Sequence, residues 1–160
     1  MNYNPPKTST VEEAKRKLEY YCSYQDRCHY EVTEKLKSLN MIPQAIDLII
    51  VHLIANNFLN EERFAVSFAR GKHNIKKWGK VRIVNELKFR QISKYNIEKA
   101  LKEISAEEYL GNFHDIAEKQ WESIKERSIP KKKKKFCDFL TRKGYESNLI
   151  FEKLNDLTED

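Results

Sequence analysis

The stretch RIVNELKFRQISKYNIEKAL, residues 82–101, decides the fold, because its apolar pattern occurs three times in the chain. In this stretch, apolar residues stand ten and fourteen positions after Leu87. The same offsets follow Leu36 in EVTEKLKSLNMIPQAIDLII (31–50) and Leu140 in KFCDFLTRKGYESNLIFEKL (135–154). The residues at these offsets are Ile46 and Ile50, Ile97 and Leu101, and Ile150 and Leu154; five after each leucine come Met41, Ile92 and Tyr145.

The pattern extends upstream of each leucine. An alanine precedes the leucine by 22 residues in the first two copies and by 23 in the third, and another packing residue follows four positions later. These pairs are Ala14 and Leu18, Ala65 and Ala69, and Ala117 and Trp121. Because the copies are 51 and 53 residues apart, the sequence predicts three copies of one unit.

Each copy has the pattern helix, helix, turn, helix. Capping boxes at Thr10-x-x-Glu13 and Ser105-x-x-Glu108, and Asn60 before two acids, indicate starts of first helices. Pro43 suits the first position of a helix, and Gly144 suits a helix end. The expected helices are 11–24, 30–39 and 43–57 in the first copy, 61–74, 80–90 and 94–104 in the second, and 106–127, 130–143 and 147–157 in the third.

We therefore expect an all-α protein, built from three tandem three-helix repeats that form an elongated, curved array. A unit of this size buries too little surface to be very stable alone, whereas stacked units share a core. Only four Gly and four Pro occur in 160 residues, too few for a β-rich fold. The expected division is a flexible tail at 1–9 and repeats at 10–59, 60–104 and 105–160.

The sequence also indicates the cellular compartment in which the protein acts. The longest apolar run, 48–53, is interrupted by His52 and is far too short to span a membrane, and the first residues lack the apolar segment of a secretory signal. Three cysteines, Cys22, Cys28 and Cys137, cannot all pair. We expect a monomer with buried or inert thiols in a reducing cytoplasm, without a membrane partner.

The net charge of +6 is concentrated in the middle of the chain. Residues 1–59 contain seven Lys/Arg and seven Asp/Glu, residues 60–104 contain twelve and five, and residues 105–160 contain eleven and twelve. This asymmetry favours a localised contact with an anionic partner, either nucleic acid or an acidic protein surface. The alternative is a basic face that only meets solvent.

No pattern in the sequence predicts catalysis, a cofactor or a metal site. The four histidines, His29, His52, His73 and His114, are not at metal-ligand spacings, and His52 on an apolar helix is more typical of a core or boundary residue. Paired glutamates at 12–13, 61–62 and 107–108 lie in first helical turns, where they complement the helix dipole. We therefore expect a protein that is not an enzyme.

The candidate partner-binding or DNA-binding residues lie between positions 63 and 90. Phe64, Ala65, Phe68 and Ala69 fall on one helical face that must turn inward, which leaves the charges outward. The segment contains one acid, Glu86, and nine basic candidates: Arg63, Arg70, Lys72, Lys76, Lys77, Lys80, Arg82, Lys88 and Arg90.

The loop at 76–80 is the most basic part of this segment. The backbone N–H groups at the start of the helix that follows, with lysines around them, suit a phosphate or a carboxylate. Trp78 in this loop could stack on a base or on a partner side chain, but we favour a lid on the local core.

A second set of candidates is the run Lys131, Lys132, Lys133, Lys134 and Lys135. Like charges at a helix start repel one another and oppose the dipole, so local stability explains the run poorly. An electrostatic contact and a solvated surface are both open interpretations.

Residues 60–92 resemble the signature of the RecX regulatory proteins, in which two acids precede Arg-Phe-Ala and a later Gly precedes Arg-Ile-x-x-Glu-Leu. The first repeat is similar to the family's opening, at Ala14, Leu18, Arg27 and Tyr30-Glu31 and at 57–59. One departure is Asn60, and another is 90–92, where a Lys-Gly-Ile turn is typical. The matched signature residues are Glu61, Glu62, Arg63, Phe64, Ala65, Phe68, Arg70, Gly79, Arg82, Ile83, Glu86 and Leu87.

This resemblance implies a modulator of the RecA recombinase. It implies binding in the helical groove of the filament of RecA on single-stranded DNA, and hence limits on filament growth, ATP hydrolysis, strand exchange and the SOS coprotease activity. DNA phosphates would be met directly or through the filament. Two other hypotheses stay open: a stand-alone nucleic-acid-binding module, and a helical scaffold for another acidic partner.

Overall fold

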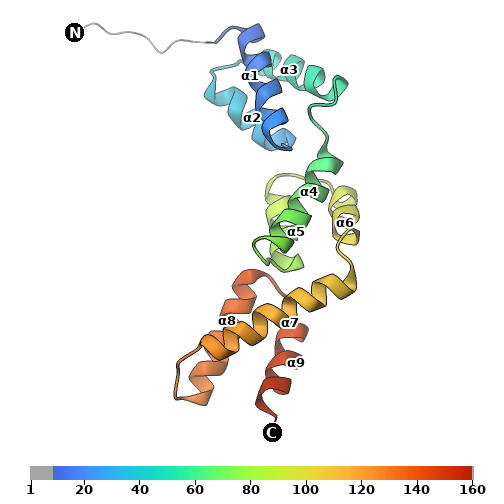
Figure 1. The fold of residues 1–160 in the computed structure, drawn as a ribbon. Helices are drawn as coiled ribbons and strands as arrows, with labels where there is room; N and C mark the ends of the chain where they lie inside the picture. Colours follow the sequence, from blue (N-terminus) through green and yellow to red (C-terminus); the bar gives the residue numbers. More distant parts are fainter. Residues whose placement is uncertain (1–8, 160) are drawn as a thin grey trace, which may run out of the picture. The chain divides into compact units, whose positions relative to one another are not determined.

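The structure is a computed structural model that describes residues 9–159 of the 160-residue chain. Within this range it contains nine α-helices and no strand (Figure 1). The predicted tail therefore lies almost wholly outside the described residues. The helices are α1 (Val11–Tyr24), α2 (His29–Ser38), α3 (Pro43–Ala55), α4 (Glu61–Asn74), α5 (Lys80–Phe89), α6 (Lys94–Lys102), α7 (Ala106–Ser123), α8 (Ile129–Lys143) and α9 (Ser147–Thr158).

The described chain divides into two compact units, which we treat separately. Unit 1 holds the described residues up to Phe64 together with Arg90–Ile92. Unit 2 holds Ala65–Phe89 and the residues from Ser93 onward. The first three-helix repeat thus lies in unit 1, and the third repeat packs with most of the second in unit 2.

Polar caps fix the helix starts, as the sequence predicts. The Thr10 hydroxyl accepts a hydrogen bond from the Glu13 N–H at 3.1 Å, and the Asn60 side chain accepts one from the Arg63 N–H at 2.9 Å. Ser105 caps α7 in the same way, and Pro43 lies in the first turn of α3. Each cap supplies an acceptor for an N–H group that has no partner within the helix.

The second helix of each repeat ends in a left-handed residue. Asn40, Gln91 and Gly144 have φ values of +59°, +59° and +96°, and each stands four positions after its repeat's leucine. This conformation reverses the chain toward the third helix of the repeat, and glycine adopts it without strain. The prediction that Gly144 ends a helix is confirmed, and Gln91 occupies the place where the family's glycine is typical.

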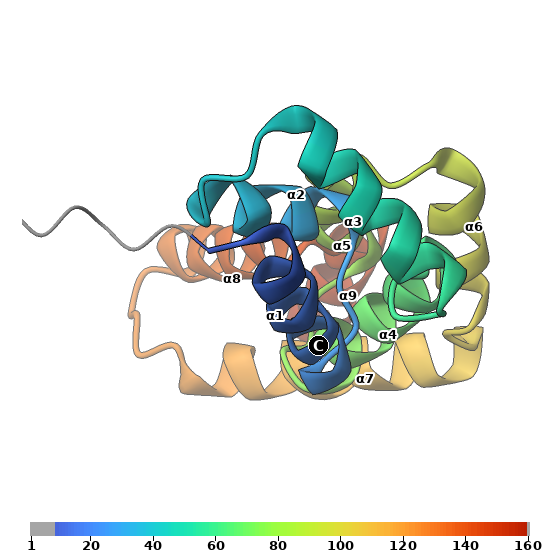
Figure 2. The same cartoon turned by 90° about the horizontal axis from the view of Figure 1, so that it is seen from above.

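The core of unit 1 forms where α1, α2 and α3 lie side by side (Figures 1 and 2). Ala14, Leu18, Leu36, Ile49 and Leu53 are completely buried there. Their spacing of three or four along each helix directs them to one face.

The core of unit 2 is more aromatic. Phe113 on α7 and Phe136 on α8 are buried, and the Phe113 ring lies 5.0 Å from that of Tyr145. Trp121 meets Phe136 edge-on at 5.5 Å. Across both units the leading alanine and the leucine of every repeat have no exposed surface, which confirms the repeat pattern: Ala14, Leu36, Ala65, Leu87, Ala117 and Leu140.

One predicted helix end is wrong. α7 was expected to reach residue 127, but it ends at Ser123, and Ile124 has an extended backbone. The residues that follow form a connection held by Glu126, whose carboxylate accepts from the Ser128 N–H and from Lys135. Ser128 then caps α8 through the Lys131 N–H, so the chain leaves α7 early to start the next helix. The other predicted ends differ by two residues at most.

Candidate functional site: cations gathered on Trp78

Trp78, in the connection between α4 and α5, is the centre of a group of cations. Its half-buried ring packs edge-on against Phe68, with ring centres 6.2 Å apart. The Lys72 ammonium lies 4.9 Å and the Arg82 guanidinium 4.1 Å from the centre of the Trp78 ring. Such cation–π contacts hold both charges in place beside the indole. The preferred interpretation of Trp78 as a packed residue is thus confirmed.

The third repeat adds one cation, Lys143, to this group. The Lys143 ammonium donates to the Lys76 carbonyl at 3.0 Å, and the Arg82 guanidinium donates to the Arg142 carbonyl at 3.1 Å. Partial burial lowers the pKa of Lys143, and the charges of Arg82 and Lys76 lower it further. We call Lys72, Lys76, Trp78, Arg82 and Lys143 the Trp78 cluster.

Sequence reasoning missed Lys143, because it stands 65 positions after Trp78 in a repeat with almost no net charge. The sequence does contain one indication that this part of the third repeat approaches a neighbour. Arg142 and Lys143 lie in the last turn of α8 directly before Gly144, and a glycine there lets the chain approach a neighbour closely.

The predicted anion site at the start of α5 is not available. The Gly79 N–H donates to the Lys143 carbonyl at 2.7 Å, and the Val81 N–H donates to the Gly144 carbonyl at 2.9 Å. The Lys80 N–H donates to the Tyr109 hydroxyl at 3.0 Å. Because the third repeat already occupies these N–H groups, an anion would meet the cationic side chains of the cluster and not the helix terminus.

A buried histidine holds the connection that carries Trp78. His73 has no exposed surface, and its Nδ1–H donates to the Trp78 carbonyl at 2.9 Å. Since a carbonyl only accepts, Nε2 is the free acceptor, and it lies 2.9 Å from the Asn112 amide nitrogen. The Lys77 ammonium donates to the Asn112 side-chain oxygen at 3.3 Å. This network fixes Trp78 and uses Lys77 as a structural donor.

The remaining unit 2 candidates lie apart from the Trp78 contacts. Lys80 is placed over the Tyr109 ring, with its ammonium 4.6 Å from the ring centre. Arg70 and Lys88 are exposed on α4 and α5.

The two candidates in unit 1 differ from these. Arg63 donates to the Asp26 carboxylate at 2.8 Å, to the Asn57 side chain, and to the carbonyls of Asn57 and Phe58. Its guanidinium is thus committed to the contact between α4 and the preceding loops. Arg90 is half-buried beside the Gln91 turn.

The lysine run forms more local contacts than its sequence suggests. Lys132 lies over the Trp121 ring at 4.1 Å, Lys134 pairs with Asp138 at 2.9 Å, and Lys135 pairs with Glu126 at 3.2 Å. The bond to Asp138 raises the pKa of Lys134. Three of the five lysines thus have partners within the third repeat, while Lys131 is exposed and Lys133 half-buried.

The described residues also bear on whether the chain holds a metal site or a membrane span. No group of His, Cys, Asp and Glu in residues 9–159 is arranged to hold a metal ion, and no helix there could cross a membrane. His52 is a boundary residue bonded to Glu19 at 2.6 Å, as expected. Burial raises the pKa of Cys22 to about 11 and that of Cys28 to about 12, so both thiols are poorly reactive.

The fold and the site define a helical-repeat protein whose conspicuous surface feature is a cluster of cations beside an aromatic ring. Two family models match it: the second three-helix domain of RecX at residues 60–101, and the third at residues 107–154. Together these matches span more than half of the chain, and the chain belongs to the RecX family.

Relatives and solved structures agree with this assignment. A protein named Regulatory protein RecX from Bacillus cytotoxicus is 29% identical over 140 residues, covering 88% of this chain and 52% of the relative. One from Bacillus cereus is 27% identical over 143 residues. The chain thus spans about half the length of the curated relatives it matches. The crystal structure of RecX from Lactobacillus salivarius superposes with a TM-score of 0.76 at 26% identity, over 92% of this chain and 96% of that one. A second RecX crystal structure, 22% identical, has the same fold, with a TM-score of 0.77.

Proposed function

We propose that this protein binds the filament of RecA on single-stranded DNA and limits its growth. Filament ATPase, strand exchange and SOS coprotease activity would fall as a result. Membership of the RecX family supports the choice of partner. The observation that carries the choice of surface is the Trp78 cluster, in which Lys72 and Arg82 lie against one aromatic ring and Lys143 of the third repeat joins them through the Lys76 carbonyl.

The proposed role needs attraction and placement but no catalytic step. A filament presents DNA phosphates and protein carboxylates, and clustered cations raise the rate and specificity of contact with such surfaces. Within the Trp78 cluster, Lys76 is exposed, and the Lys72 ammonium lies beside the Trp78 ring. Arg63 and Lys77 instead hold intramolecular bonds. We propose a monomeric, non-enzymatic regulator acting in the cytoplasm.

The test measures DNA-dependent ATPase of RecA assembled on single-stranded DNA while this protein is titrated at sub-stoichiometric amounts. We expect the wild type to lower ATPase, and Lys72→Gln/Lys76→Gln to need about tenfold more protein, because losing about 1.4 kcal/mol of binding is a tenfold change. The matched control is Lys102→Gln/Lys119→Gln, which removes the same charge from exposed positions on α6 and α7.

Two results would overturn parts of this proposal. ATPase and filament length that stay unchanged over the whole titration would exclude the filament role. Equal effects of the two double variants would exclude the Trp78 cluster as the binding surface.

The placement of Lys72 and Arg82 beside an indole also suits a stand-alone nucleic-acid-binding module. That function predicts tight binding to bare DNA with a steep salt dependence, and no effect on RecA. In that case Lys72→Gln/Lys76→Gln would reduce the salt slope by roughly one to two units. If binding to the filament and binding to DNA both survive the change, the Trp78 cluster is a solvated surface and not the binding site.

A further inference from the structure

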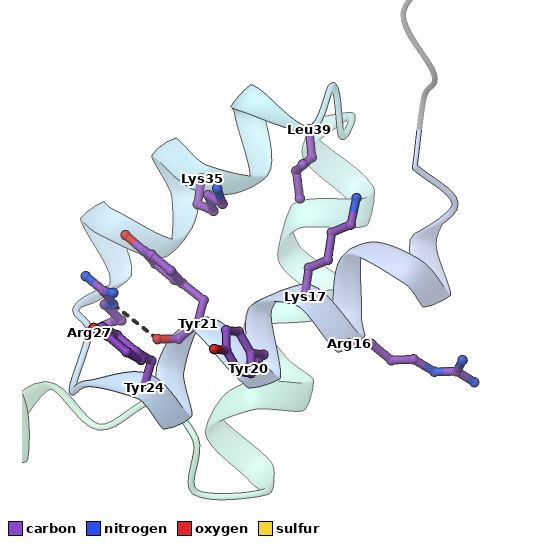
Figure 3. A pocket seen from close by; sticks show the side chains of 8 residues that line it. All are labelled: Arg16, Lys17, Tyr20, Tyr21, Tyr24, Arg27, Lys35 and Leu39. Carbon is purple, nitrogen blue, oxygen red and sulfur yellow. Dashed lines mark hydrogen bonds between the residues drawn. The ribbon is translucent and has the colours of Figure 1, made fainter.

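We propose that a groove on unit 1 binds single-stranded nucleic acid by stacking bases on tyrosines. The groove has a volume of about 620 Å³ and lies between α1 and α2 (Figure 3). Tyr20, Tyr21 and Tyr24 of α1 form much of its surface, and Lys35 of α2 and Leu39, directly after α2, border it. None of these residues was a sequence candidate, and none belongs to the Trp78 cluster.

Two of the tyrosines present open ring faces. The side chains of Tyr20 and Tyr24 are 72% and 73% exposed, one helical turn apart, with ring centres 6.5 Å from each other. That separation is about twice the 3.4 Å that separates consecutive bases along one strand. Both rings are therefore within reach of a single strand a few nucleotides long, and each stacked base adds affinity regardless of its identity.

The third tyrosine, Tyr21, is held in a fixed position at the base of the groove. The Arg27 guanidinium lies 3.8 Å from the centre of the Tyr21 ring, and its Nε–H donates to the Tyr21 carbonyl at 3.2 Å. The Glu31 carboxylate, 3.6 Å from Arg27, offsets much of that charge. Arg27 therefore positions Tyr21, and the cations left for a ligand come from elsewhere in the groove.

Those cations are Arg16, Lys17 and Lys35. The Lys35 ammonium is 5.8 Å from the Tyr21 ring centre, Lys17 bonds the Ser9 hydroxyl at 2.9 Å, and Arg16 extends outward from α1 (Figure 3). No acidic residue lines the described groove. An anionic ligand therefore meets cations at the rim and aromatic surface inside.

This combination selects a single strand over other anions. In a duplex the base faces are stacked on one another, so only a single strand can offer them to tyrosine. An acidic peptide would use the cations but would leave the exposed rings without a role. The cations attract any strand alike, so base stacking is the part of the affinity that distinguishes a strand with bases from one without them.

The test uses the full chain and needs no RecA, so its result is independent of the ATPase experiment. Fluorescence anisotropy compares an oligothymidylate of about 12 nucleotides with an abasic strand of equal length and charge. We expect Tyr20→Ala/Tyr24→Ala to weaken oligothymidylate binding about fivefold to thirtyfold and to leave abasic binding unchanged. Tyr20→Phe/Tyr24→Phe keeps the ring faces and should bind like the wild type.

The matched control is Tyr95→Ala, which removes a tyrosine that is 68% exposed on α6. It should not change binding. Thermal unfolding verifies that the variants stay folded, as expected for such exposed positions. The proposal is overturned if wild type binds the two strands equally, if Tyr95→Ala weakens binding as much as the double variant, or if a polyglutamate peptide displaces the oligonucleotide while the double variant still binds it.

Discussion

The helices α2 and α5 hold the same place in their repeats, yet the N–H groups at their starts are satisfied by different chemistry. Cys28 and Gly79 stand at equivalent positions, eight residues before their repeats' leucines. At α2, no side chain of the preceding residue caps the helix, and the Glu61 carboxylate accepts from the His29 N–H at 2.7 Å. The Asp26–Arg63 ion pair at 2.8 Å reinforces this contact.

At α5, backbone carbonyls and a phenol hydroxyl accept the hydrogen bonds of the N–H groups at the helix start. Lys143 and Gly144 supply the carbonyls, and the Tyr109 hydroxyl accepts from the Lys80 N–H. That hydroxyl in turn lies 2.9 Å from both carboxylate oxygens of Glu146. Burial is the main reason that the pKa of Tyr109 is raised far above its ordinary value, so the phenol stays neutral.

The difference shows that one fold position can be stabilised by charge or by close packing. We expect the ionic contact at α2 to weaken with added salt, because salt screens partly exposed charges. The contact at α5 depends on a close backbone approach at two glycines. An added Cβ at Gly79 would overlap the carbonyl of Gly144, and one at Gly144 would overlap Arg82.

The largest effect is expected for Gly79→Ala. The methyl group must displace backbone atoms of the third repeat, so we expect the free energy of unfolding to fall by about 3 kcal/mol. Chemical denaturation measures the loss. The controls are Gly71→Ala and Gly111→Ala, whose added methyl groups meet open space in helices and should stabilise by about 0.5–1 kcal/mol. If Gly79→Ala leaves the stability unchanged or raises it, as expected for the controls, the close contact does not form.

A smaller effect is expected when the charge is removed at α2. Glu61→Gln keeps an acceptor for the His29 N–H but loses its charge, so unfolding should become easier by about 1 kcal/mol at low salt. Tyr109→Phe should cost a similar amount by leaving the Lys80 N–H unpaired. Denaturation at low and high salt separates the two: the loss at Glu61 shrinks as salt screens the wild-type contact, and the loss at Tyr109 persists.

The alkylation rate of the Cys28 thiol gives a second measure of the contact between Glu61 and the start of α2. Its pKa of about 12, against an ordinary 9, means that the folded thiol hardly ionises near neutral pH, so alkylation requires local opening. Glu61→Gln should therefore speed Cys28 labelling about fivefold, with the half-buried Cys137 as internal reference. Because the unfolded thiol ionises near pH 9, folding stability should also fall as the pH rises from 9 toward 12. Equal labelling rates in both proteins would contradict the ionic contact.

The repeat was predictable because it depends on spacing alone. Every leading alanine and leucine of the pattern is buried, since helix periodicity directs them inward without help from distant residues. The helix caps were predictable for the same reason, because Thr10, Asn60 and Ser105 act on N–H groups three residues away.

The site was less predictable because its contacts join distant parts of the chain. Nothing local to Gly79 indicates that Lys143 and Gly144 occupy the N–H groups of α5. The net charge of a segment also does not show how its charged side chains are distributed over the surface. The neutral first repeat carries an aromatic groove lined by cations, since some of its carboxylates pair outside the groove, as Glu34 does with Lys37.

The smallest effect is expected at the other ends of these helices, where α2, α5 and α8 finish on Asn40, Gln91 and Gly144. Glutamine is strained at positive φ, whereas asparagine tolerates it. Gln91→Gly should stabilise the protein by about 0.5 kcal/mol, because relief of the strain is partly offset by the greater freedom of glycine in the unfolded chain. Asn40→Gly has little strain to relieve, so it should be neutral or slightly destabilising in the same denaturation experiment. If the two variants shift stability equally, the turn at Gln91 is unstrained, and the missing family glycine has no energetic consequence.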